Sequence, residues 1–137
     1  MQKKTFLITG GSGGIGAALA HKLVKISYTP LIVYKSNREK AEDLARAVDG
    51  EAIELNLIDL DAVDRVVANL AASDVVLAGV VLGASAPLRI TSFGHISEQD
   101  MENQWRVNVL GHQRLLAGLV RKVFSKRKQG IVVGILS

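Results

Sequence analysis

Residues 9–16 read Thr9-Gly10-Gly11-Ser12-Gly13-Gly14-Ile15-Gly16, and this stretch decides the fold of the chain. It joins a short apolar run, KTFLIT at residues 4–9, to a segment of helical periodicity that starts at Ile15. A pyrophosphate needs backbone N–H groups that point at it, and side chains in the turn would hold the backbone away. The first turn of a helix adds the positive end of its dipole. The stretch therefore predicts a strand, a phosphate-binding turn and a helix.

Two other interpretations of these glycines are weaker. A merely flexible glycine-rich loop would have no reason to lie between a buried strand and an amphipathic helix. A phosphate loop for ATP or GTP would continue into Lys-Ser or Lys-Thr, whereas Ala17-Ala18 follows Gly16 here.

Working outward from the turn, apolar runs alternate with helical periodicity along the whole chain. We expect strands at residues 4–9, 31–34, 52–57, 75–82 and 131–136. Four helices are expected between them; Ser36 and Glu39 have capping-box spacing, Asp59 is a candidate cap, and the last helix starts at Ser97. Five strands alternating with helices predict an α/β fold, a doubly wound parallel sheet of the Rossmann type, in one domain spanning residues 1–137.

Composition excludes several classes of function. The chain has 137 residues, of which 48% are hydrophobic and 22% charged, and it has no cysteine. A disulfide framework, a thiolate metal site and a cysteine nucleophile are thereby excluded. His21, His95 and His112 lack ligand spacing, so we expect no metal site and place these side chains at the surface or in loops. No segment reaches membrane-spanning length, which favours a cytoplasmic protein without a membrane partner.

The net charge of the chain is +4. Its cations include a basic run at Arg121, Lys122, Lys126, Arg127 and Lys128. We interpret this run as the solvated end of a long helix, with a docking patch for an acidic partner as the alternative. No aromatic residues interleave with these cations, so nucleic acid is not expected as a partner.

Thr9, Gly10, Gly14 and Gly16 give the spacing Thr-Gly-x-x-x-Gly-x-Gly, which resembles the short-chain dehydrogenase/reductase family. The closest likeness is to its classical type, which includes the 3-oxoacyl-[acyl-carrier-protein] reductases. The resemblance covers the chain element by element. It implies an oxidoreductase that transfers hydride between a nicotinamide and a carbonyl or alcohol substrate, either a small molecule or one bound to an acyl carrier.

The resemblance also implies a homodimer or homotetramer built on the long helix at residues 98–124. Trp105 and a stripe of Leu116, Leu119 and Val123 are the candidate contacts, although core packing explains the same residues equally well.

Residues 34–38, Tyr34-Lys35-Ser36-Asn37-Arg38, predict which dinucleotide binds. NAD-specific proteins place a carboxylate about twenty residues beyond the glycines to accept from the ribose 2′-hydroxyl. This segment has no acid, but two cations and two short polar side chains that suit a 2′-phosphate. We therefore predict NADPH rather than NADH, although Gly13 stands where many NADP-using relatives carry a basic residue.

Two further strand ends match the family's adenosine-binding segments. Asn56-Leu57 takes the place of the family's usual Asp-Val. Leu82-Gly83-Ala84-Ser85 takes the place of the family's Asn-Asn-Ala-Gly. Asn56 is either an acceptor for the adenine amino group or a turn residue at the strand end. The candidate cofactor-binding residues are Thr9, Gly10, Gly11, Ser12, Gly13, Gly14, Ile15, Gly16, Tyr34, Lys35, Ser36, Asn37, Arg38, Asn56, Leu57, Gly83, Ala84 and Ser85.

Asn108 and Ser137 are the candidate catalytic residues that the resemblance implies. Asn108 matches the asparagine that holds a water in a proton relay, or it is a polar residue satisfied at a helix kink. Ser137 matches the serine that donates a hydrogen bond to the substrate oxygen as negative charge develops.

The family's acid/base pair, Tyr-x-x-x-Lys, is not among these residues, whose only tyrosines are Tyr28 and Tyr34. Activity would therefore require a tyrosine and a lysine beyond Ser137, in a chain of ordinary family length. The alternatives are a truncated inactive form or a dinucleotide-binding sensor without chemistry.

Overall fold

The five apolar runs form a single sheet, in a computed structural model that describes residues 2–135. The strands are β1 (Lys4–Thr9), β2 (Tyr28–Tyr34), β3 (Glu51–Glu54), β4 (Val76–Leu82) and β5 (Ile131–Gly134). Their order across the sheet is β3-β2-β1-β4-β5, and every neighbouring pair is parallel. The predicted doubly wound α/β fold is confirmed.

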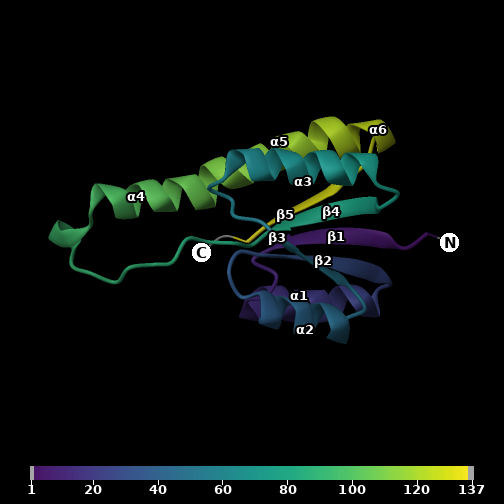
Figure 1. Ribbon diagram of the computed structural model, residues 1–137, viewed down its shortest axis with the longest axis horizontal. Coiled ribbons are helices and arrows are strands. Elements are labelled where there is room, and N and C mark those ends of the chain that lie inside the picture. Colours follow the sequence, from purple (N-terminus) through teal and green to yellow (C-terminus); the bar gives the residue numbers. More distant parts are fainter. Residues whose placement is uncertain (1, 136–137) are drawn as a thin grey trace.

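Helices cover both faces of this sheet (Figure 1). On one face lie α1 (Gly14–Lys25) and α2 (Arg38–Ala47), and on the other lie α3 (Leu60–Ala72) and a long C-terminal helix. Successive side chains of a strand point to opposite faces, so β1 serves two cores. Leu7 packs with Val63 of α3 on one face, whereas Phe6 and Ile8 pack with Ala20 of α1 on the other.

The long helix is continuous but contains two π-helical segments. Its parts are α4 (Glu98–Trp105), a π-helical segment (Arg106–Gly111), α5 (His112–Leu119), a second π-helical segment (Val120–Phe124) and α6 (Ser125–Arg127). As expected, Ser97 caps its start, in a capping box with Asp100. The helix ends at Lys128, which has a left-handed conformation. In Figure 1, α4 extends beyond the edge of the sheet.

Two details at the first helices differ from the prediction. The buried residues of α1 are Gly16, Ala20 and Leu23, whereas Ile15 and Ile26 are 66% and 64% exposed. Glycine and alanine face the sheet because α1 packs close to the turn that precedes it.

The second helix begins differently too. Asn37 rather than Ser36 caps α2, because its side-chain oxygen accepts from the backbone N–H of Lys40 at 3.2 Å.

Part of the apolar stripe on the long helix is buried in the core, and another part is exposed. Leu119 and Val123 are buried in the core against the sheet, so for these two residues core packing, the alternative to a subunit contact, is confirmed. Three apolar side chains remain exposed: Trp105 at 57%, Met101 at 64% and Val109 at 43%. These three residues, which we call the α4 stripe, are spaced four apart and therefore lie along one side of the helix.

Candidate functional site

The glycine turn between β1 and α1 is shaped by two close approaches. Gly10 has φ +65°, a conformation that favours glycine, and a Cβ there would lie 2.9 Å from the backbone of Ala84. A Cβ on Gly16 would lie only 2.6 Å from the Cα of Gly11, so the helix could not pack on the turn with any larger residue. Gly13 caps α1 without a side-chain hydrogen bond, and a Cβ on Gly14 would meet open space. The first turn of α1 is therefore open to a ligand.

Thr9 holds this turn against the end of β4. Its hydroxyl is fully buried and accepts the backbone N–H groups of Gly83 at 2.9 Å and Ala84 at 3.1 Å. Because β1 and β4 are adjacent and parallel, their carboxyl ends lie side by side at this point. One side chain thus fixes the distance between two loops.

The glycine turn and the three other strand ends of the prediction line one cavity. This strand-end cavity has a volume of about 420 Å³ and opens at the carboxyl edge of the sheet. Its lining residues are Gly10, Ser12, Gly13, Val33, Tyr34, Lys35, Ser36, Asn37, Leu55, Asn56, Leu57, Gly83, Ala84, Ser85, Ala86, Pro87 and Val107. In doubly wound folds, ligands bind in the crevice outside the carboxyl ends of the strands.

Six candidate cofactor residues lie outside the lining of this cavity. Gly14, Ile15 and Gly16 line a smaller adjoining hollow of about 190 Å³. Thr9 contributes to the same hollow but acts mainly as the clamp described above. Gly11 is buried against Ile32. The sixth, Arg38, lies in the first turn of α2.

The two cations expected near a 2′-phosphate are placed differently. Lys35 lines the strand-end cavity and is exposed. Arg38 instead forms an ion pair with Glu42, with 2.7 Å between Nε and Oε1, and that carboxylate raises the pKa of the guanidinium. Lys35 is therefore the cation best placed to meet an anion in the cavity.

The turn after β3 is organised by side-chain caps. Asn56 lines the cavity, and its amide oxygen accepts the backbone N–H of Ile58 at 3.2 Å. Asn56 therefore serves as a turn residue, and its oxygen keeps a second lone pair for a ligand. Asp59 caps α3 by accepting from the N–H of Ala62 at 3.0 Å, as the sequence predicted.

Asn108 lies in the first π-helical segment, a type of helix distortion that is frequent at functional sites. Its amide oxygen accepts the N–H of Ala86 at 2.9 Å, and its nitrogen donates to Gln104 at 2.7 Å. Gln104 in turn donates to the carbonyl of Pro87 at 3.0 Å. The central helix thereby holds the loop that follows β4 and lines the strand-end cavity. Ser137 lies outside the described residues.

His112 is the site residue that the sequence interpretation missed. It was expected at the surface, yet it is only 7% exposed, and its Nε2 lies 2.9 Å from the hydroxyl of Thr9. The available signal was its spacing of four residues from Asn108, which places both on one side of the helix. His21 and His95 are exposed, as expected.

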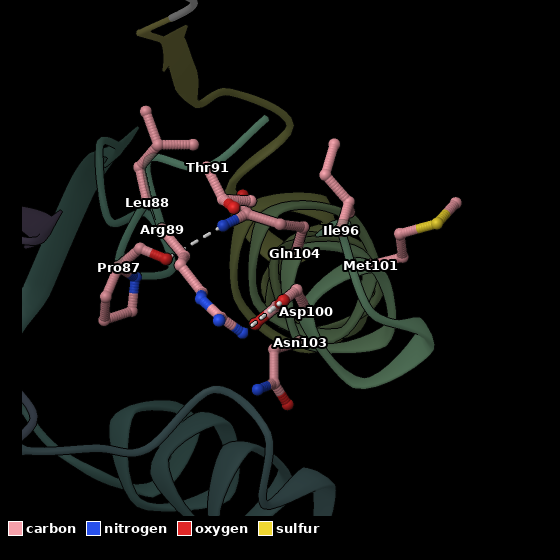
Figure 2. A pocket seen from close by; sticks show the side chains of 9 residues that line it. All are labelled: Pro87, Leu88, Arg89, Thr91, Ile96, Asp100, Met101, Asn103 and Gln104. Carbon is pink, nitrogen blue, oxygen red and sulfur yellow. Dashed lines mark hydrogen bonds and ion pairs between the residues drawn. The ribbon is translucent and has the colours of Figure 1, made fainter. Parts of the chain in front are cut away.

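A second cavity of about 410 Å³ lies between the loop after β4 and the start of the long helix; we call it the loop cavity. Figure 2 shows Gln104 reaching the carbonyl of Pro87 and Arg89 paired with Asp100 across it. Pro87 lines both cavities, so they adjoin.

The described residues offer neither a metal-binding cluster nor a membrane-spanning helix. Residues 2–135 contain no group of three or more His, Asp or Glu side chains that could hold a metal ion. Within the same range, every helix is too short or too polar to cross a bilayer.

Comparison with known proteins identifies relatives over the whole chain. A family model described as short chain dehydrogenase matches residues 4–137. A 3-oxoacyl-[acyl-carrier-protein] reductase of Aggregatibacter actinomycetemcomitans is 30% identical over 98% of this chain and 57% of its own length. A short-chain dehydrogenase from Streptomyces avermitilis has a TM-score of 0.87 at 28% identity, covering 98% of this chain and 49% of that one.

A structure of BdcA in complex with NADPH has a TM-score of 0.77 at 25% identity, covering 89% of this chain and 48% of that one. The chain thus spans about half the length of the relatives that it matches.

Proposed function

Because the chain belongs to the short-chain dehydrogenase family, we propose that it is an NADPH-dependent oxidoreductase acting on a carbonyl or alcohol substrate. The observation that carries this proposal is the strand-end cavity, which the carboxyl ends of β1, β2, β3 and β4 surround. Such a cavity, with a glycine turn and a helix start on one side, suits an extended molecule with a central diphosphate.

The residues present fit a nicotinamide dinucleotide. At Gly10 and Gly16 the backbone approaches so closely that a Cβ would clash, as a turn that receives a diphosphate requires. The start of α1 has no side-chain cap, so its N–H groups remain available to phosphate oxygens. Ser12 and Gly13 line the cavity beside it and would bind the same group.

Lys35 would recognise the 2′-phosphate of NADPH. It lines the cavity at the end of β2, and Ser36 beside it adds a hydroxyl. Arg38 is held by Glu42 and contributes mainly to the general positive charge of this region. Asn56 and Leu57 after β3, with Gly83, Ala84 and Ser85 after β4, would border the adenosine.

When bound, the dinucleotide would supply the hydride that reduces a carbonyl or accept the hydride that an alcohol loses. The chain's own residues orient the two partners: Asn108 and Gln104 hold the loop after β4, which borders both cavities. Ser137 would donate a hydrogen bond to the substrate oxygen as negative charge develops on it. A role for Asn108 in a proton relay stays a prediction; each polar atom of its amide has one partner in the protein, which leaves one N–H and one lone pair for a water.

A carbonyl substrate carried by an acyl-carrier protein is the finer form of this proposal, and the similarity to a 3-oxoacyl-[acyl-carrier-protein] reductase supports it. The basic run offers no additional support. It lies at the end of the long helix, next to the start of β5, and therefore at the edge of the sheet opposite to the strand-end cavity. The loop cavity, with Leu88, Ile96 and Met101 in its lining, would receive an apolar part of the substrate.

Titration of the protein with NADPH and with NADH tests the proposal. We expect tighter binding of NADPH, and a Lys35→Ala variant should lose about tenfold in affinity for NADPH, the worth of one charge-assisted hydrogen bond, with little change for NADH. Lys40→Ala removes an exposed cation outside the cavity and is the matched control. Failure of the folded protein to bind either dinucleotide would overturn the proposal. Equal losses of NADPH and NADH affinity in Lys35→Ala would overturn only the NADPH assignment.

A further inference from the structure

A buried imidazole connects the central helix to the glycine turn. His112 lies in α5, and its Nε2 is 2.9 Å from the hydroxyl of Thr9, a residue 103 positions away in the sequence. Its Nδ1 is 3.5 Å from the backbone carbonyl of Asn108. The same Thr9 hydroxyl accepts the N–H groups of Gly83 and Ala84, which line the strand-end cavity.

The hydrogen bonds of Thr9 fix the state of this imidazole. A hydroxyl has one proton and two lone pairs. Gly83 and Ala84 occupy both lone pairs, so the proton of Thr9 is the group that faces His112 or the more distant carbonyl of Val81 at 3.4 Å. His112 can therefore accept at Nε2 only while that nitrogen carries no proton. The matching tautomer carries its proton on Nδ1, directed at the carbonyl of Asn108.

We propose that His112 is a positioning residue for cofactor binding, which keeps the glycine turn and the end of β4 in register only while its imidazole is neutral. The inference rests on the proposed function, because it takes the strand-end cavity to be the NADPH site. A protonated His112 would present an Nε2–H to an oxygen whose lone pairs are already used. One of the three donors would then lose its acceptor, and two of the three belong to residues that line the cavity.

The surroundings favour the neutral form. Burial lowers the pKa of His112, and the hydrogen bond to the carbonyl of Asn108 opposes this effect only in part. The charged groups on the elements packed against α5, or within it, are Asp61, Asp64, Arg65, Arg106, Arg114, Arg121 and Lys122. None of them is among the causes that shift the pKa of this histidine. Asp64 is already paired with Arg114 at 2.7 Å near the surface.

Two substitutions separate positioning from simple packing. His112→Gln keeps an oxygen that can accept from Thr9 but does not titrate, whereas His112→Leu fills the space without an acceptor. His21→Gln, at an exposed position on α1, is the matched control for the loss of a histidine.

NADPH affinity is measured for the four proteins from about pH 7.5 down to the lowest pH at which all four stay folded, because burial places the pKa of His112 below the ordinary histidine value. At the upper pH, His112→Leu should bind about fivefold more weakly, as for the loss of one hydrogen bond, with His112→Gln close to wild type. On acidification, the wild type and His21→Gln should weaken at least about threefold more than His112→Gln. The 2′-phosphate itself titrates in this range, and the comparison with His112→Gln removes its contribution.

Each outcome bears on the inference. Equal affinities of His112→Leu and wild type, or parallel pH profiles of His112→Gln and wild type, would overturn it while leaving NADPH binding intact. Absence of dinucleotide binding by the wild type would overturn the proposed function and this inference with it. A loss of affinity in His112→Leu that His112→Gln does not restore would reduce His112 to a packing residue.

Discussion

Replacing Thr9 by valine should destabilise the fold through two backbone groups far away in the sequence. Valine has nearly the same shape as threonine, so packing at this fully buried position is preserved. The hydroxyl disappears, so the N–H groups of Gly83 and Ala84 lose their acceptor at 2.9 and 3.1 Å, and Nε2 of His112 loses its donor at 2.9 Å. Both residues are only partly buried, so water can replace some of the lost bonding. Each of the two backbone groups costs about 1 kcal/mol at the low end of the usual range, which gives a loss of at least about 2 kcal/mol before the lost bond to His112 is added.

The measurement is the free energy of unfolding by urea, supported by the thermal midpoint. A loss of about 2 kcal/mol corresponds to a fall of roughly 6–10 °C for a domain of this size. Thr5→Val is the matched control, because Thr5 lies in the same strand, is 9% exposed and has no side-chain hydrogen bond in the described part of the chain. Thr5→Val should be neutral or slightly stabilising. If both variants have the same stability, the Thr9 hydroxyl does not hold the loops after β1 and β4 together.

Two further predictions concern the long helix. The pKa of Asp64 is lowered by its hydrogen bond to Arg114, so its contribution to stability is present above the unfolded pKa and is lost as pH falls through the folded pKa. Thermal midpoints of Asp64→Asn and wild type should therefore differ near neutral pH and converge in strong acid; a constant difference would contradict this origin. We also expect the α4 stripe to mediate self-association. The molar mass measured by light scattering should therefore be smaller for Trp105→Glu than for wild type, whereas the control Gln113→Glu, at an exposed polar position, should match wild type. A monomeric wild type would refute it.

The sequence was sufficient to predict the sheet, because parallel strands buried on both faces, as β1 and β2 largely are, leave continuous apolar runs. It was less informative about which side of a helix faces the sheet. Ile15 and Ile26 fit the helical period of α1, yet the buried side carries Gly16 and Ala20. Periodicity reports apolar spacing, whereas the orientation here is decided by how closely the helix approaches the glycine turn, and small residues permit that approach.

The site was predicted at the level of segments and less well at the level of side chains. The lining of the strand-end cavity follows from four strand ends that the sequence marks clearly. Lys35 and Arg38 could not be ranked without the structure, because the partner of Arg38 is Glu42 on the next turn of α2. His112 was placed at the surface or in a loop because the three histidines show no ligand spacing. Its burial depends on Thr9, a contact between residues that no local pattern connects.

The strand order explains why Thr9 and His112 matter more than their small size indicates. In a sheet of order β3-β2-β1-β4-β5, the chain proceeds from β1 to one side through β2 and β3, and then returns to the other side at β4. The loops after β1 and β4 therefore diverge over opposite faces, and the crevice between them is where doubly wound folds bind ligands. A crevice formed by diverging loops keeps its width only if something ties the two sides together. Thr9 does so within the sheet, and His112 anchors Thr9 to the helix layer above it.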